Sequence, residues 1–163
     1  MRIFGIDPGL TGAIAILDDK KIVEVTDLPT MSDGKKNKKQ LNSAHLSQYI
    51  SSNIIDLSKS VVVVEQVNAM PGQGVTSMFN FGQTFGAIKG ICAALELPIF
   101  FVRPSKWKKH FELINSSKDS SRTKAIEMYP KLSNQLAKKK DVNKSDAILI
   151  ARFFSETRLT EVN

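Results

Sequence analysis

Residues 2–17 read RIFGIDPGLTGAIAIL, and the rest of the chain is organised around this stretch. An apolar run leads to a single acid, Asp7, and to the turn residues Pro8 and Gly9, and a second apolar run begins at Ala13. Two apolar runs joined by a tight turn predict a pair of strands. Asp7 is then held at the mouth of a sheet, and its meaning depends on whether other carboxylates reach the same place.

The composition indicates one globular domain with a basic surface. The chain has 163 residues, of which 42% are hydrophobic and 24% charged, as in ordinary soluble proteins. Lysine and arginine outnumber aspartate and glutamate by 23 to 16, which gives a net charge of +7. Such a surface favours a polyanionic partner, most commonly nucleic acid, although a merely solvated lysine-rich surface has the same charge.

The cysteine and hydropathy patterns predict a reducing, aqueous compartment. Cys92 is the only cysteine and lies in an apolar helical pattern, which is typical of a buried free thiol. No apolar run approaches the roughly 18 residues that a membrane-spanning helix needs. We therefore expect a cytoplasmic, nucleoid-associated protein with no membrane partner.

The hydrophobic periodicity predicts five strands and five helices in one α/β domain. The strands are expected at 2–7, 13–17, 20–25, 61–67 and 98–103. Four consecutive valines, 61–64, indicate that the fourth strand is buried on both faces. Helices are expected at about 43–57, 76–95, 104–111, 116–129 and 146–154. The polar, lysine-rich segment 29–40 is predicted to be a mobile loop.

Three acids lie at the ends of predicted strands or at the start of a predicted helix, where their carboxylates can form a site. Asp7 ends the first strand, Glu65 ends the valine strand, and Asp146 opens the last helix behind a capping Ser145. In this order of elements the first and fourth strands are neighbours, so Asp7 and Glu65 meet, and a helix across the sheet can bring Asp146 beside them. Clustered carboxylates repel one another unless a hard cation such as Mg²⁺ or Mn²⁺ neutralises them. Two such ions suit phosphodiester hydrolysis.

Each acid also has a structural interpretation. Asp7 before Pro-Gly can be a turn residue. Glu65 can be a surface acid at the end of a strand, and Asp146 can be a first-turn acid favoured by the helix dipole. The three positions together are harder to explain structurally than any one of them alone.

Five sequence segments, taken together, resemble the RuvC family of Holliday junction resolvases, chiefly its short phage-type and bacterial members. They are IDPGLTG (6–12), VEQV (64–67), AMPGQGVTSMFNFGQ (69–83), PSKWKKHF (104–111) and KKDVNKSDAILIAR (139–152). The resemblance implies a ribonuclease H-like fold over residues 1–158, with a C-terminal tail at 159–163. It implies a five-stranded mixed sheet of order 3-2-1-4-5 flanked by helices. It also implies a homodimer that cuts branched DNA, such as four-way junctions, with two Mg²⁺ or Mn²⁺ ions per site. Asp7, Glu65 and Asp146 match the family's catalytic, metal-binding acids.

The chain departs from the family pattern at the fourth metal ligand. The family usually carries an acid or a histidine three residues before the last catalytic acid, and here that residue is Asn143. Many phage-type members instead carry an Asp-His pair five and four residues before it, and this chain keeps Asp141 but has Val142. An asparagine carbonyl can ligate a hard cation without contributing charge. Asn143 and Asp141 are therefore alternative fourth ligands.

The predicted DNA contacts lie after the valine strand and in the lysine clusters. Asn68 replaces an aromatic wedge of some family members, and Met70, Met78, Phe79 or Phe81 could stack on bases instead. We favour core positions for Phe81 and Phe85, a core or interface position for Trp107, and a structural or surface role for the two histidines. The full predicted contact set is Asn68, Met70, Gln73, Ser77, Phe79, Lys106, Lys108, Lys109, Lys138, Lys139 and Lys140.

The function expected from these residues is a Mg²⁺-dependent, structure-selective DNA endonuclease. One alternative is a junction-binding protein with weak or lost catalysis, motivated by Asn143. Another is a fragment of an actin-like or sugar-kinase-like ATPase, because those folds also open with a strand, an acid and a glycine-threonine turn. The small size of the chain and the lack of a phosphate-binding loop argue against the ATPase.

Overall fold

The structure is a computed structural model that describes the chain except for residues 35–37, 67, 69–71 and 159–163. Its centre is a mixed sheet of order β3-β2-β1-β6-β7, which confirms the predicted ribonuclease H-like order. The strands are β1 (Arg2–Asp7), β2 (Ala13–Asp18), β3 (Lys21–Asp27), β6 (Ser60–Glu65) and β7 (Ile99–Val102). β1 to β3 pair antiparallel, whereas β6 and β7 run parallel to β1.

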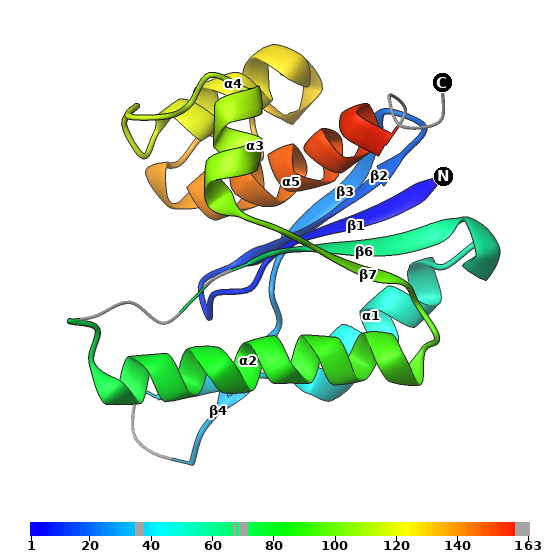
Figure 1. Ribbon diagram of the computed structural model, residues 1–163, viewed down its shortest axis with the longest axis vertical. Coiled ribbons are helices and arrows are strands. Elements are labelled where there is room, and N and C mark those ends of the chain that lie inside the picture. Colours follow the sequence, from blue (N-terminus) through cyan, green and yellow to red (C-terminus); the bar gives the residue numbers. More distant parts are fainter. Residues whose placement is uncertain (35–37, 67, 69–71, 159–163) are drawn as a thin grey trace.

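Helices cover both faces of the sheet (Figure 1). One face carries α1 (Ser43–Asn53) and α2 (Val75–Ala94). The other carries α3 (Pro104–His110), α4 (Ser120–Met128) and α5 (Val142–Arg158). Single 3-10 turns lie at Leu57–Lys59, Pro130–Leu132 and Lys139–Asp141. The predicted tail at 159–163 lies outside the described residues.

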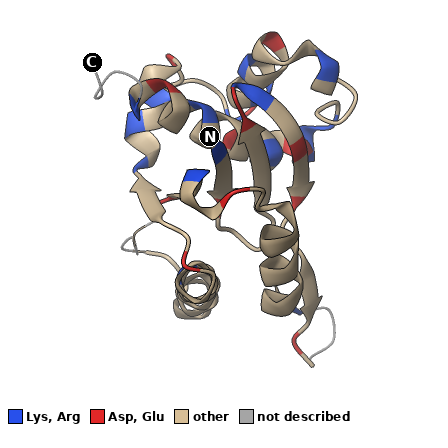
Figure 2. Ribbon diagram, turned by 90° about the vertical axis from the view of Figure 1, so that its right-hand side faces the viewer, with Lys and Arg blue, Asp and Glu red and all other residues tan. Residues whose placement is uncertain are grey.

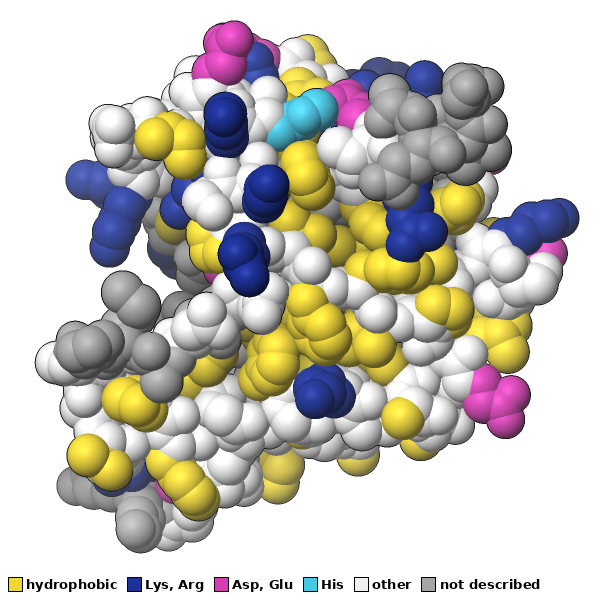
Figure 3. Space-filling view, viewed as in Figure 1, with side chains coloured by type: hydrophobic (Ala, Val, Ile, Leu, Met, Phe, Trp, Pro, Cys, Tyr) yellow, Lys and Arg dark blue, Asp and Glu magenta, His cyan; other side chains and the backbone are white. Residues whose placement is uncertain are grey.

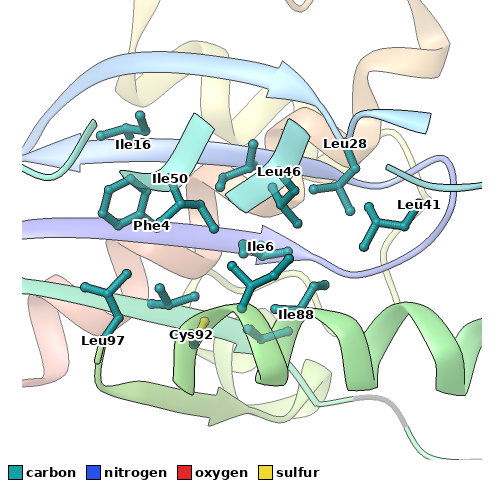
Figure 4. Packing of buried hydrophobic residues seen from close by; sticks show 14 residues of the cluster. Phe4, Ile6, Ile16, Leu28, Leu41, Leu46, Ile50, Ile88, Cys92 and Leu97 are labelled. Carbon is teal, nitrogen blue, oxygen red and sulfur yellow. The ribbon is translucent and has the colours of Figure 1, made fainter. Parts of the chain in front are cut away.

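The core alternates across the sheet. Phe4, Ile6 and Ile16 point toward α1 and α2, where Ile50 and Ile88 pack against them (Figure 4). Alternate residues of the same strands, such as Ile3 and Leu17, face α5 on the other side. Burial on both faces explains why these strands read as nearly continuous apolar runs. Cys92 is a buried free thiol in the first of these clusters, as predicted.

The segment predicted as a mobile loop contains a small hairpin. Thr30–Ser32 (β4) pairs antiparallel with Lys39–Leu41 (β5), so the prediction of an unstructured loop was wrong for these residues. Each strand is only three residues long and mostly exposed, so the hairpin has little hydrophobic periodicity. Leu41 anchors the hairpin because its side chain is buried in the core.

The last helix begins earlier than predicted. α5 starts at Val142, directly after the 3-10 turn Lys139–Asp141, and Ser145 does not cap it. The Ser145 hydroxyl instead donates to the carbonyl of Asp141 at 3.2 Å. Asp146 therefore lies beyond the first turn of α5, where the helix dipole gives an acid little stabilisation. That placement weakens the purely structural interpretation of Asp146.

Among the described residues, no helix combines the length and apolarity needed to cross a membrane.

Candidate active site

Asp7 and Glu65 end two neighbouring parallel strands. β1 and β6 are in register with Ile6 opposite Val64, so the next residue of each strand brings its carboxylate to the same edge of the sheet. The turn after Asp7 is compact, with the Gly12 N–H donating to the Gly9 carbonyl at 2.9 Å. A Cβ atom at Gly12 would clash with the carbonyl oxygen of Asp7, so only glycine fits there. This turn holds the end of β1 in place.

Helix α5 brings the third acid to this edge. α5 packs across β1 and β2, and Gly5 allows a close approach, because a Cβ at Gly5 would lie 2.7 Å from the Ala151 Cβ. Asp146 is on α5, and its charge acts on Asp7, as does the charge of Glu65. Glu65 also acts on Asp146. The structure thus brings together the three acids singled out in the sequence.

The electrostatics of the cluster disfavour three ionised carboxylates. Burial, aided by the charges of Glu65 and Asp146, raises the pKa of Asp7 to about 7. Burial likewise raises the pKa of Asp146 to about 6, although the Ser121 hydroxyl opposes the shift. Burial also raises the pKa of Glu65, against a hydrogen bond from Trp107 and the charge of Lys108. A cation at this site would relieve the repulsion and favour the ionised forms.

The acids offer oxygen ligands that suit a hard cation. Oδ1 of Asp146 is buried and has no hydrogen-bond partner in the described part of the chain, so this oxygen is free to serve as a ligand. Within the described ranges, no group of three or more His, Cys, Asp or Glu side chains is arranged so that it could hold a metal ion. The three carboxylates act on one another through their charges.

Helix α3 supplies two residues whose direct effects on the carboxylates the sequence did not predict, although Lys108 was expected beside the site as a phosphate contact. The Trp107 side chain is fully buried, and its Nε1–H donates to Oε1 of Glu65 at 2.9 Å. The charge of Lys108 opposes the rise in the pKa of all three acids, and its Nζ lies 5.3 Å from the centroid of the Trp107 ring. The prediction that Trp107 is a core residue is confirmed. No spacing signal links Trp107 to Glu65, because the two are 42 residues apart.

The two candidates for the fourth ligand are engaged elsewhere. The carboxylate of Asp141 accepts the backbone N–H of Lys138 at 2.9 Å and faces the Lys144 ammonium at 3.4 Å. Burial alone would raise the pKa of Asp141, but these two partners outweigh it and lower the pKa. The Asn143 side-chain N–H donates to the carbonyl of Thr11, which ties the start of α5 to the β1–β2 turn. Neither side chain has a recorded hydrogen bond to Asp7, Glu65 or Asp146 within the described part of the chain.

Some predicted DNA contacts gather at the start of α2. Asn68, Gln73 and Ser77 line a cavity of about 400 Å³ together with Phe81 and Phe85. Phe79 lies outside this lining, and its side chain is 65% exposed. Phe85 packs against the core as expected, whereas Phe81 is half-buried on the cavity wall. The predicted contact Met70 lies outside the described residues.

The predicted lysine contacts lie on and beside the helices that carry the site. Basic side chains gather over α3 on the face shown in Figure 3, and the α3 sequence contains three lysines. Lys106 and Lys109 are exposed, whereas Lys108 is half-buried. Residues 138–140 are exposed lysines just before α5. Lys140 also lines a second cavity, of about 480 Å³, that Lys39, Thr11 and Asn143 border.

The architecture matches that of known junction resolvases. RuvC from Thermus thermophilus aligns over 97% of both chains with a TM-score of 0.62 at 17% identity. RuvC from T. thermophilus in complex with a Holliday junction substrate aligns over 96% of both chains, with a TM-score of 0.58 at 14% identity. The fowlpox virus Holliday junction resolvase aligns over the full length of both, with a TM-score of 0.53 at 18% identity. No protein-family model and no curated protein matches the sequence. The chain therefore has the fold of RuvC-like resolvases.

Proposed function

We propose that the chain is a metal-dependent endonuclease that cuts branched DNA, with Asp7, Glu65 and Asp146 as its metal-binding acids. The observation that carries this proposal is that three half-buried carboxylates from β1, β6 and α5 are close enough for their charges to act on one another at one edge of a RuvC-like sheet. Clustered carboxylates without a cation destabilise a fold, whereas a hard cation needs several carboxylate oxygens and neutralises their charge. The solved structures of the same fold include a complex with a Holliday junction substrate, which supports a branched DNA substrate.

The side chains of the chain have separable roles in this chemistry. Two bound Mg²⁺ ions, for which Mn²⁺ can substitute, would supply the activated water and stabilise the leaving 3′ oxygen. Asp7 and Glu65 would hold the ions from rigid strand ends, and Asp146 would complete the set with its unsatisfied oxygen. Asp141 would serve as a further ligand only after giving up its present partners, whereas Asn143 would offer its side-chain carbonyl oxygen while its N–H donates to Thr11.

Lysines would hold the DNA backbone over the site. Lys106, Lys109 and the lysines at 138–140 are exposed beside α3 and α5, which fits contacts to phosphates. Asn68, Gln73, Ser77 and Phe79 stand at the opposite side of the carboxylate edge, around the start of α2. A four-way junction is broad enough to contact both regions. Together these residues would orient the scissile phosphate.

A homodimer would pair two such sites, and α2 is its best interface. Figure 2 looks along α2, which is almost entirely uncharged. Lys89 is the one charged residue in its sequence. A Cβ added at Gly82, Gly86 or Gly90 would meet nothing within 4 Å, so these glycines leave an open helix face. An open face of glycines lets a second helix approach closely. Val75, 84% exposed, extends the apolar surface.

One experiment tests the proposed activity. The wild-type chain and Asp7→Asn would be incubated with an end-labelled four-way junction, with Mg²⁺ or with EDTA. We expect nicking only with Mg²⁺, and a fall to below about 1% of the wild-type rate in Asp7→Asn. Junction binding, measured in Ca²⁺ by gel shift, is the control and stays within about threefold, because Asp7 makes no base contact. Cutting that persists in EDTA or in Asp7→Asn would refute the assignment.

A junction-binding protein with weak catalysis is the second candidate. The observation in its favour is Asn143, which adds no charge and whose N–H is already bonded to Thr11. Tight junction binding without nicking at any Mg²⁺ concentration would favour it. The alignments with resolvases extend over nearly the whole of both chains, and this match of fold argues against the ATPase alternative.

A further inference from the structure

The contact between Trp107 and Glu65 joins two elements that are far apart in sequence. Glu65 ends β6, and Trp107 lies in the middle of α3, beyond β7. The indole Nε1–H donates to Oε1 of Glu65 at 2.9 Å, an ordinary length for a strong hydrogen bond. A glutamate has three rotatable side-chain bonds, so a fixed donor removes much of its conformational freedom.

Trp107 is itself held rigidly. Its side chain is 0% exposed and packs with Ile3, Val63 and Leu149, which come from β1, β6 and α5. The ring cannot reach DNA from this position, so stacking on bases does not explain it. Its one polar atom points at Glu65, and a buried indole N–H needs an acceptor. The core that holds β1, β6 and α5 together therefore also orients the donor.

The donor is chemically suited to a carboxylate that binds a cation. The indole N–H is neutral and only donates, so it occupies one carboxylate oxygen without adding a positive charge beside a bound ion. The second oxygen, Oε2, remains available as a ligand. Partners of this kind, which orient a ligand without touching the metal, commonly change metal affinity by about 10- to 100-fold when removed.

We propose that Trp107 is a positioning residue that fixes the Glu65 carboxylate for divalent-cation binding through its indole N–H. The inference rests on the proposed function, since it takes Glu65 to be a metal ligand. Trp107 touches neither DNA nor the ion. Its effect is confined to how readily Glu65 adopts the geometry that binds a cation.

Trp107→Phe provides the first test, because it keeps an aromatic ring in the core and deletes the donor. We expect the Mg²⁺ concentration for half-maximal nicking of a four-way junction to rise about 10-fold or more, with the rate at saturating Mg²⁺ within about threefold of wild type. Mn²⁺ affinity without DNA, measured by electron paramagnetic resonance, should weaken by the same factor. Phe111→Leu is the matched control, because Phe111 is a buried aromatic residue of the same cluster whose ring has no polar atom.

The two variants separate positioning from packing. Phe111→Leu should lower the melting temperature and leave Mn²⁺ affinity unchanged, whereas Trp107→Phe should lower Mn²⁺ affinity even at temperatures where it is fully folded. Equal Mn²⁺ affinity in Trp107→Phe and the wild type would overturn the positioning role and leave the nuclease assignment standing. Failure of the wild-type chain to bind Mn²⁺ at all would overturn both.

The wild-type chain offers a second test that needs no core mutation. Trp107 is the only tryptophan, so the intrinsic tryptophan fluorescence comes from the ring bonded to Glu65. Titration with Mg²⁺ should change this emission with the same midpoint as the nicking activity, and Glu65→Gln should abolish the change. Emission that stays constant while calorimetry detects Mg²⁺ binding would contradict the coupling.

Discussion

At the scale of single residues, the main feature is the raised pKa of two carboxyl groups at the site, Asp7 and Asp146. The pKa of Asp7 rises from its usual 3.8 to about 7, and that of Asp146 from 3.8 to about 6, mainly because both groups are buried. The folded chain then binds protons that the unfolded chain releases at lower pH. Protonation therefore stabilises the metal-free fold, and this stabilisation is lost as the pH rises through the raised pKa values.

The stability of the metal-free protein should fall with rising pH. In EDTA, we expect the melting temperature of the wild type to decrease from about pH 5 to about pH 8, and Mg²⁺ to restore it at the upper end. Asp7→Asn carries no titrating group at that position, so its melting temperature should depend less on pH over the same window. Thermal unfolding followed by circular dichroism measures both. Parallel curves for the two proteins would contradict a raised pKa at Asp7.

Residue by residue, the sequence predicted the acids but not their partners. Asp7 and Glu65 could be placed side by side, because the valine run signalled a central strand and the order of elements made it a neighbour of the first strand. The hydrogen bond from Trp107 to Glu65 and the effect of the Lys108 charge on Glu65 could not be predicted, because both depend on how α3 is rotated on the sheet. Hydrophobic spacing predicts which face of a helix is buried, and it does not predict which buried atom meets a polar group.

At the scale of elements, the close packing of β1 and α5 controls where Asp146 lies. A Cβ at Gly5 would clash with the carbonyl of Ala147, the residue after Asp146. The turn between β2 and β3 also has a defined geometry, because its two residues, Asp19 and Lys20, both have positive φ, as a two-residue hairpin turn requires. The start of α5 was predicted too late because the Asp141 side chain, rather than Ser145, bonds to the backbone ahead of the helix. Such local caps are poorly specified by pattern.

Gly5→Ala should push α5 away from the sheet. We expect a loss of about 1–3 kcal/mol in the free energy of unfolding, as for other overpacked cores, together with weaker Mg²⁺-dependent nicking because Asp146 moves. Urea unfolding and the junction assay measure the two effects. Ser52→Ala, on the exposed side of α1, is the control and should stay within about 0.5 kcal/mol of wild type. A Gly5→Ala protein of wild-type stability would show that the packing is loose there.

At the scale of the whole molecule, α2 is the surface that we propose as the homodimer interface. Gly86→Arg places a large charged side chain on its open face without disturbing the monomer, because no atom lies within 4 Å of that Cβ position. We expect the wild type to have twice the 18.1 kDa mass of the single chain in light scattering, and Gly86→Arg to have the single-chain mass. Ser52→Arg on α1 should remain dimeric. A dimeric Gly86→Arg protein would place the interface elsewhere.

The basic surface makes a separate prediction about DNA affinity. Lys106 and Lys109 are exposed on α3, so the double substitution to alanine should reduce the slope of log affinity against log salt by about 0.9 for each phosphate that the variant no longer neutralises. Fluorescence anisotropy with a labelled four-way junction at several salt concentrations gives this slope. Lys59→Ala is the control, because Lys59 directly precedes the first residue of β6, whereas Glu65 is the last residue of that strand. An unchanged slope in the double variant would remove α3 from the DNA path.

The position of α5 across β1 and β2 also has a consequence for the order of events during synthesis. Asp7 and Asp146 are more than a hundred residues apart in the sequence, so the three acids meet only after long-range contacts form. Contacts of such high sequence separation form late in folding. A nascent chain still attached to the ribosome has the first two acids but lacks the docked helix. The three acids would therefore come together only after α5 has been synthesised and has docked on the sheet.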